Sequence, residues 1–372
     1  MKKLVCLILF FSFTETSSSQ GLSQEADIFL LTIGPGQALY SCFGHSALWV
    51  LDKTNKIDEV YNYGTFDFDE DNFYLKFVLG NLKYKLSIDD VVDLQRFYGY
   101  EGRFVNIQKL ILSNSDKQKI YDRLKQEYKP ENRYYLYDFK SNNCATRIAD
   151  VLFDISEVKV DSSGLYKDST FRDLLHVYLS EKPWLGLGID LILGRPVDEK
   201  VDLRTASFLP NYLSKALKMM KKNNKKISSP SGKLLRAKHQ RSEVNFWDFP
   251  WFSIGLFFTI AFFLRNKGVG LFIYKVTYTV TILISILLLF LVLFTLHPTT
   301  KMNFNLLWAN PILGCMPFLS ENKNIKKILL WIYFSQVLFY LSGLHGQAVL
   351  VEVMPLVLFL SYYLIRRNRR FI

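Results

Sequence analysis

The chain divides into two parts when its hydrophobic and polar positions are followed from end to end. Up to about Asn245, apolar residues alternate with polar and charged ones, whereas from Phe246 onward the sequence is mostly apolar. A mixed pattern is typical of a globular domain, and long apolar runs are typical of membrane helices. The pattern therefore predicts one soluble domain followed by a membrane domain.

The soluble part, residues 20–217, carries the signals of an α+β domain. Short apolar runs and strict alternation are typical of buried and half-buried strands. On this basis strands are predicted at Asp27–Ile33, 47–51, 59–63, 82–88 and 105–112.

Helices are predicted between and after these strands. Ser115 and Gln118 have the spacing of a capping box for a helix that ends at Tyr128. A second helix, residues 144–153, follows a cap at Asn142 or Asn143. A third, Phe171–Leu179, is apolar and contains His176, for which a structural role is expected.

The first 19 residues have the pattern of a secretion signal. Lys2 and Lys3 precede an apolar stretch at 4–13, and small polar residues follow at 16–19. Ten apolar residues are too few to span a bilayer as a mature helix. The alternative interpretation is an uncleaved anchor.

The membrane part, residues 246–372, predicts a bundle of about five transmembrane helices. A polar, basic linker at 218–245 precedes it. Basic residues follow the first, third and fifth segments, whereas the two other turns carry Lys301 alone. This alternation puts the soluble domain outside and the C-terminus in the cytoplasm. The apolar segments are 247–264, 271–296, 304–319, 328–344 and 347–365, of which the third is interrupted by Asn305, Asn310 and Pro311.

The chain is basic, but its motifs argue against nucleic-acid, metal and cofactor binding. The 372 residues carry a formal net charge of +12, much of it in the run 218–241 and at the C-terminus. No nucleic-acid module accompanies this charge, and an export signal argues against such a partner. No residues have metal-ligand spacing and no glycine-rich phosphate loop follows a strand, so neither a metal nor a cofactor is expected.

Two of the four cysteines belong to the soluble domain. Cys6 falls in the predicted signal and Cys315 in an apolar segment, which leaves Cys42 and Cys144. In an oxidising compartment these two could form a disulfide bridge.

Cys144 is the first candidate for chemistry. A cysteine in the first turn of a helix meets unpaired backbone N–H groups and the positive end of the helix dipole. Both favour the reactive thiolate, and the same N–H groups can stabilise an oxyanion. The alternatives are a small buried cysteine and the bridge to Cys42.

His45, at the start of an apolar strand, is the candidate general base for Cys144. A base needs a partner that orients it, and Asn62 on the next strand is the first choice. Asp67 and Glu101 are the alternatives. A lone histidine can also be a purely structural hydrogen-bond donor.

A polar group interrupts the apolar part at its predicted outer side. It includes His297, Asn303 and Asn305, which we expect to contact the substrate because polar residues at such depths are costly. The alternative is an interfacial loop anchored by Trp308.

Several motifs together resemble one protein family, the Lnb family. They cover nearly the whole mature chain, and the segment 297–311 resembles the companion transmembrane domain. The soluble-domain motifs are Gly34-Pro35-Gly36, Phe43-Gly44-His45-Ser46-Ala47, Tyr61-Asn62-Tyr63-Gly64-Thr65-Phe66-Asp67-Phe68, Glu101-Gly102-Arg103, Glu131-Asn132-Arg133-Tyr134-Tyr135 and Asn143-Cys144-Ala145-Thr146-Arg147-Ile148.

The resemblance implies a bacterial lipoprotein N-acyltransferase in the inner membrane, with its soluble domain in the periplasm. It also implies a circularly permuted NlpC/P60, papain-like fold in which the catalytic cysteine and histidine correspond to Cys144 and His45. The acyl donor would be a membrane phospholipid and the acceptors bacterial lipoproteins. A thiol peptidase or amidase acting on cell-wall peptides, and a non-catalytic scaffold, are the alternative functions.

Overall fold

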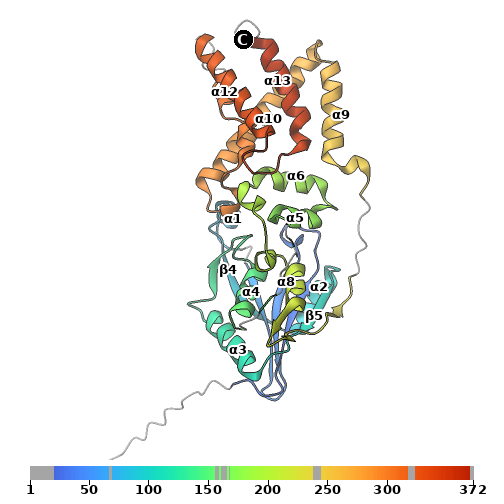
Figure 1. Cartoon of the computed structure of the whole chain (residues 1–372), viewed down its shortest axis with the longest axis vertical. Helices are drawn as coiled ribbons and strands as arrows, with labels where there is room; N and C mark the ends of the chain where they lie inside the picture. Colours follow the sequence, from blue (N-terminus) through green and yellow to red (C-terminus); the bar gives the residue numbers. More distant parts are fainter. Residues whose placement is uncertain are drawn as a thin grey trace, which may run out of the picture.

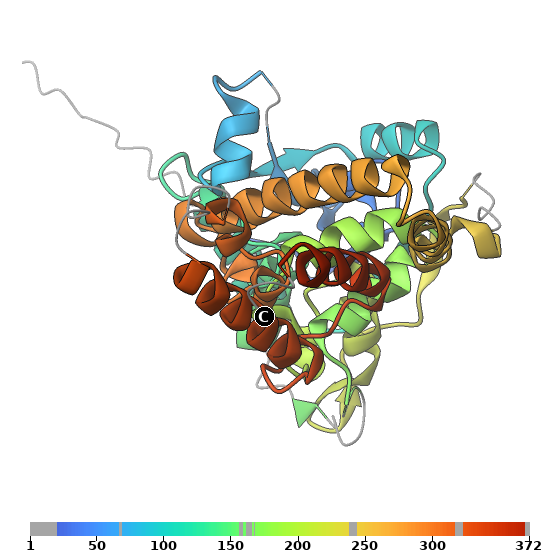
Figure 2. The same ribbon diagram turned by 90° about the horizontal axis from the view of Figure 1, so that it is seen from above.

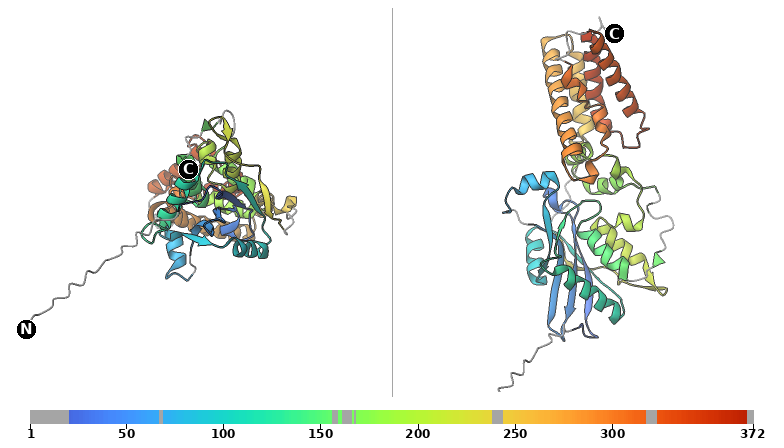
Figure 3. Two further views of the ribbon diagram at one scale, coloured as in Figure 1. Left: turned by 90° about the horizontal axis from the view of Figure 1, so that it is seen from below. Right: turned by 90° about the vertical axis from the view of Figure 1, so that its left-hand side faces the viewer.

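The computed structural model has a sheet-containing domain at one end of its long axis and a helical domain at the other (Figures 1 and 3). The predicted signal, residues 1–19, lies outside the described residues. The structure describes residues 21–66, 69–155, 159–160, 166, 168–237, 244–316 and 323–368.

A seven-stranded sheet, in which all neighbouring strands are antiparallel, forms the centre of the soluble domain. The five predicted strands are all present. The strand order is β10-β5-β1-β2-β3-β4-β6. The bounds are β1 Asp27–Ile33, β2 His45–Asp52, β3 Ile57–Thr65, β4 Lys83–Asp89, β5 Val105–Lys109, β6 Tyr134–Leu136 and β10 Gly232–Leu235.

Helices cover both faces of this sheet (Figure 1). Helices α3 (Asn114–Tyr128), α4 (Cys144–Ile155) and α8 (Pro210–Met219) pack on one face, and α2 (Val91–Tyr100) packs on the other. Tyr61 and Tyr63 face the first group, as expected for residues that alternate with Asn62.

The predicted cap of α3 is wrong by two residues. The Ser113 side chain, rather than that of Ser115, accepts the Asp116 N–H at 3.1 Å.

A layer of short helices lies between the sheet and the helical domain (Figure 1). Arg172 holds this layer together, because its buried guanidinium binds Asp190 and Asp198. The layer consists of α5 Phe171–Leu179, α6 Pro183–Ile192 and η2 Arg195–Asp198, whereas the short helix α7 Leu203–Ala206 packs against α8. Two further short helices of the soluble domain are η1 Leu39–Ser41 and α1 Phe73–Leu79.

The predicted linker is partly folded. Strands β8 (Met220–Lys222) and β9 (Lys225–Lys226) form a small sheet with β7 (Lys159–Val160), and β10 extends the main sheet. This polar segment has few apolar side chains, and individual contacts hold it against the soluble domain. Ile227 is 3% exposed, and the Ser228 hydroxyl bonds the Leu217 carbonyl at 3.0 Å.

The apolar part is a helical bundle above the soluble domain (Figures 2 and 3). Among the described residues, one helix, α10, is long and apolar enough to cross a membrane. Helix α9 has 14 residues and α13 has 15, fewer than the roughly 20 that a span needs. The described elements are η3 Phe246–Asp248, α9 Pro250–Phe263, α10 Gly268–Phe294, η4 Pro298–Thr300, η5 Phe304–Leu307, α11 Ile312–Cys315, α12 Lys323–Leu341, η6 Val351–Val353 and α13 Met354–Asn368.

The third predicted segment is not a continuous helix over its described residues. It consists of η5 and α11, and residues 317–322 lie outside the description. The Asn303 and Asn310 carboxamides accept the backbone N–H groups of Asn305 and Ile312, so they cap separate short turns. The prediction of five spans therefore remains a prediction.

Candidate active site

Asn143 begins helix α4 and so positions Cys144. Its side-chain oxygen accepts the N–H groups of Ala145 at 2.8 Å and Thr146 at 2.9 Å. Its amide nitrogen donates to the Phe139 and Phe208 carbonyls at 2.7 and 2.9 Å. An N-cap of this kind stabilises a helix by about 1 kcal/mol. Of the two predicted caps, Asn143 is the one that forms.

Cys144 meets strand β3 at Gly64. A Cβ atom on Gly64 would lie 3.7 Å from Cys144 Cβ, and the glycine has a φ of +90°, which side chains rarely adopt. The strand register also shifts between Tyr63 and Thr65. The strand thus bends at Gly64, the residue that faces the thiol. Because glycine has no side chain, the side of β3 that faces the thiol is left uncovered at this position.

His45 and Cys144 form a hydrogen-bonded pair. Burial alone would raise the pKa of Cys144, but the His45 charge and hydrogen bond, with the Ser46 and Ala145 N–H groups, lower it. Burial alone would lower the pKa of His45, but Cys144 and the bond to Asn62 raise it. Both directions favour the thiolate–imidazolium form of the pair over the neutral form, and the thiolate is the reactive form of a cysteine.

Asn62 and Asp89 orient the imidazole. The His45 Nε2–H donates to Asn62 Oδ1, which leaves Nδ1 for the thiol. Asn62 Nδ2 donates to Asp89 Oδ2 at 2.7 Å, and this bond fixes which end of the carboxamide faces His45. We call Cys144, His45, Asn62 and Asp89 the thiol cluster.

The structure also places the two alternative orienting residues. Glu101 pairs with Arg103 at 2.8 Å rather than with His45. Asp67 lies outside the described residues. Asn62, the first choice from the sequence, is thus the residue bonded to His45.

Sequence reasoning missed Asp89. Asn62 pairs with Ser87, and Asp89 is two residues further along β4, so the two side chains are diagonal neighbours on one face of the sheet. Periodicity predicts both strands, but the register between them is needed to see this contact.

Two donors for an oxyanion lie beside the thiol. The first N–H groups of a helix have no intrahelical partner, and Asn143 occupies those of Ala145 and Thr146, which leaves that of Cys144. The Tyr135 hydroxyl lies 3.8 Å from the point that a Cβ on Gly64 would take. Burial raises the pKa of Tyr135, so its hydroxyl keeps its proton and can donate.

Cys42 and Cys144 differ in the direction of their pKa shifts. Both are unpaired thiols in the structure, so the bridge between them is not formed. Burial raises the pKa of Cys42 to about 11, a shift that the Lys182 charge and a backbone N–H only partly offset. Cys42 is therefore a protonated, unreactive thiol near neutral pH.

His297, Asn303 and Asn305 contact the soluble domain but not the thiol cluster. His297 Nε2 donates to the Phe77 carbonyl of α1 at 3.0 Å. Asn303 and Asn305 donate to carbonyls at the end of α6, among them that of Leu191 at 2.9 and 3.1 Å. These contacts favour a role in joining the two domains over the predicted contact with substrate.

His176 likewise lies outside the thiol cluster, and its ring bonds Asp190 at 2.8 Å.

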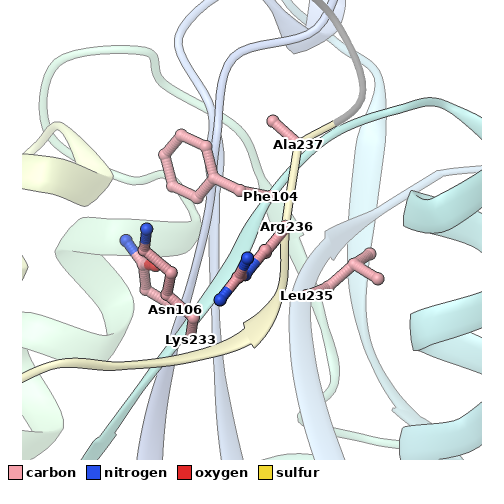
Figure 4. A pocket seen from close by; sticks show the side chains of 6 residues that line it. All are labelled: Phe104, Asn106, Lys233, Leu235, Arg236 and Ala237. Carbon is pink, nitrogen blue, oxygen red and sulfur yellow. The ribbon is translucent and has the colours of Figure 1, made fainter.

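The described residues contain no group of three or more metal-ligating side chains. A cavity of about 440 Å³ lies along β5 and β10 (Figure 4), and no residue of the thiol cluster lines it. Its lining residues are Phe104, Asn106, Lys233, Leu235, Arg236 and Ala237.

The fold and the site define the class of protein to which the chain belongs. Proteins of this class have an α+β domain with a thiol–imidazole pair at the end of a sheet, joined to an apolar helical domain. Two family models match the chain. The Lnb N-terminal periplasmic domain matches residues 15–176, and the Lnb transmembrane domain matches residues 238–368.

The chain belongs to the Lnb family, as its motifs predicted. It is thus a membrane protein with a periplasmic domain. No curated protein and no solved structure matches it.

Proposed function

We propose that this protein is a lipoprotein N-acyltransferase of the bacterial inner membrane. It transfers an acyl chain from a membrane phospholipid, through a thioester on Cys144, to the N-terminal amine of a diacylglyceryl-cysteine lipoprotein. The observation that carries the proposal is the thiol cluster, in which His45 is hydrogen-bonded to Cys144 and to Asn62, and Asn62 in turn to Asp89.

In the first half-reaction the Cys144 thiolate attacks the ester carbonyl of the phospholipid. The tetrahedral oxyanion accepts hydrogen bonds from the Cys144 N–H and the Tyr135 hydroxyl. It collapses with cleavage of the ester C–O bond, and the His45 imidazolium protonates the departing lysophospholipid oxygen.

In the second half-reaction the lipoprotein amine attacks the thioester carbonyl. Neutral His45 takes a proton from the amine as the new C–N bond forms. The C–S bond then breaks, which returns Cys144 to the thiolate and His45 to the imidazolium. One acyl chain has moved from an ester to an amide.

The position of the thiol cluster supports a lipid donor over a cell-wall peptide. His45 pairs with Ile33 at the end of the sheet nearer the helical bundle (Figure 3). The loop after Ile33 is held by Lys182, at the start of α6, through the Gly36 and Gln37 carbonyls. Helix α6 in turn contacts α9 and η5 of the bundle.

Mass spectrometry of a lipoprotein's N-terminal peptide tests the proposal. In proteoliposomes with the wild-type protein, the diacylglyceryl-cysteine peptide should gain the mass of one acyl chain. The Cys144→Ala protein in the same vesicles is the control. Cleaved cell-wall peptides with no N-acylated product would instead support the peptidase or amidase alternative.

The pH dependence of Cys144 alkylation tests the thiol–imidazole pair without any assumption about the substrate. Because its pKa is lowered, Cys144 should react with iodoacetamide well below the pH that an ordinary thiol needs. Asn62→Ala removes a bond that raises the pKa of His45, so the thiolate loses part of its partner's charge. Near pH 6, alkylation of Cys144 in Asn62→Ala should be about tenfold slower than in the wild type, which corresponds to a difference of roughly one unit in the pKa of Cys144.

The experiment uses a Cys315→Ser background, because Cys315 is an exposed thiol. Cys42, with a pKa of about 11, should stay unlabelled and serves as an internal control. Identical pH profiles for the wild type and Asn62→Ala would contradict the role given to Asn62.

A further inference from the structure

Helix α1 exposes apolar side chains although it belongs to the soluble domain. Tyr74 is 76% exposed and Leu75 is 57% exposed, and Phe77 and Val78 are also exposed. Only Phe73 of this helix is buried. A contiguous set of exposed apolar residues marks a surface that meets another apolar phase or a partner.

The contacts of α1 with the residues that follow α10 determine where α1 lies relative to the membrane. The Leu296 N–H donates to the Leu79 carbonyl at 2.8 Å, and His297 bonds the Phe77 carbonyl. Gly80 ends α1 with a φ of +77°, and a Cβ there would lie only 3.2 Å from Leu296 Cβ. Leu296 and His297 come just after Thr295, the C-cap of α10, which is the apolar helix long enough to cross a membrane, so α1 lies beside the outer end of α10 (Figures 1 and 2).

A second exposed apolar pair is linked to α1 through the Phe66 ring. Leu39 and Tyr40 are 57% and 60% exposed on η1. The Tyr40 ring is 6.2 Å from that of Phe66, which is 5.8 Å from that of Phe73 in α1. We call Leu39, Tyr40, Tyr74, Leu75, Phe77 and Val78 together the apolar platform.

A row of aromatic rings leads from this platform toward the nucleophile. Phe66 is 5.2 Å from Tyr84, and Tyr84 stacks on Tyr137 at 4.4 Å. Tyr135 packs against the same cluster, and its hydroxyl lies beside Gly64, the residue that faces Cys144. Burial and the nearby Cys144 charge both raise the pKa of Tyr137, consistent with a ring close to the thiol.

We propose that the apolar platform lies in the outer leaflet of the lipid bilayer and that the aromatic row guides an acyl chain from the leaflet to Cys144. The occupant of the platform is a lipid surface because α1, which carries four of the six platform residues, is hydrogen-bonded to Leu296 and His297 beside the end of the apolar helix α10. This inference rests on the proposed acyl transfer for the role of the row, but the membrane contact itself does not.

An environment-sensitive dye tests the membrane contact. The dye is attached at Leu75→Cys in a full-length Cys144→Ala, Cys315→Ser background in phosphatidylcholine vesicles. Its emission should shift to the blue and be quenched by nitroxide-labelled lipids. The control is Tyr100→Cys in the same background, since Tyr100 on α2 is 93% exposed and outside the platform. A dye at position 75 that remains in water, like the one at 100, overturns the membrane contact.

Acylation of Cys144 tests the delivery of the chain. Leu75→Glu and Phe66→Glu should each slow acylation by vesicle phospholipid by about tenfold, equivalent to roughly 1.4 kcal/mol, because a charge on the path disfavours the acyl chain. Loading of Leu75→Glu from a water-soluble short-chain ester should be unchanged, and Tyr100→Glu should behave as the wild type with both donors. The readout is the mass of the intact protein.

The outcomes separate this inference from the proposed function. If neither donor acylates the wild type, acyl transfer fails, whatever the dye reports. If the wild type is acylated and Leu75→Glu and Phe66→Glu match Tyr100→Glu, delivery along the platform and row is overturned while acyl transfer stands.

Discussion

Replacing Cys144 by serine should abolish acyl transfer while leaving the fold intact. The substitution keeps the side chain's size at the first turn of α4, where Asn143 caps the helix independently of the sulfur. A serine hydroxyl is not ionised by His45 near neutral pH, so the nucleophile is lost. Loss of a nucleophile commonly lowers kcat by at least about 10⁴-fold.

The measurement is the mass of the lipoprotein's N-terminal peptide, with thermal unfolding as the test of folding. The matched control is Cys42→Ser, which should keep most of the activity because Cys42 is a protonated thiol. Full activity in Cys144→Ser, or an acyl group found on another residue, would refute the thioester mechanism.

Asn305→Leu should uncouple the two domains and abolish transfer in membranes. Asn305 is fully buried and donates to the Asp190 and Leu191 carbonyls at 3.2 and 3.1 Å. Its oxygen accepts from Trp308 at 3.2 Å and Tyr340 at 3.0 Å. Leucine satisfies none of these groups, and each buried group left unpaired costs about 1–3 kcal/mol.

Alkylation of Cys144 separates uncoupling from loss of the site. In Asn305→Leu the thiol should still react quickly with iodoacetamide, because the thiol cluster lies within the soluble domain. Asn132→Leu, which removes an exposed amide, is the control and should leave transfer unchanged. If Asn305→Leu keeps its stability and loses only affinity for lipoprotein, Asn305 contacts the substrate as the sequence first predicted.

The strands and the start of the thiol helix could be predicted because both depend on neighbours in sequence. Alternation identifies β4 from its own residues, and a cap requires only Asn143 and the N–H groups that follow it. The thiol–imidazole pair could be proposed from position alone, since His45 begins a strand and Cys144 begins a helix.

Contacts that depend on register or on docking could not be predicted in the same way. Asp89 reaches Asn62 only because β3 and β4 pair in one register. Asn303 and Asn305 are polar residues in an apolar segment, and such residues can serve either a substrate or a neighbouring domain. Their partners on α6 lie more than a hundred residues away in sequence, so only the folded arrangement distinguishes the two roles.

Strand β10 links completion of the soluble domain to insertion of the helical domain into the membrane during biosynthesis. Residues 232–235 form the edge of the main sheet against β5, and the first bundle helix begins shortly afterwards at Pro250. Throughout export, β5 therefore remains an open edge until the first helix of the bundle is about to enter the bilayer. Open edges pair readily with other chains, so β5 is accessible to such pairing during this interval. A secreted fragment that ends at 217 would keep that edge permanently open, whereas one that ends after Leu235 would close it.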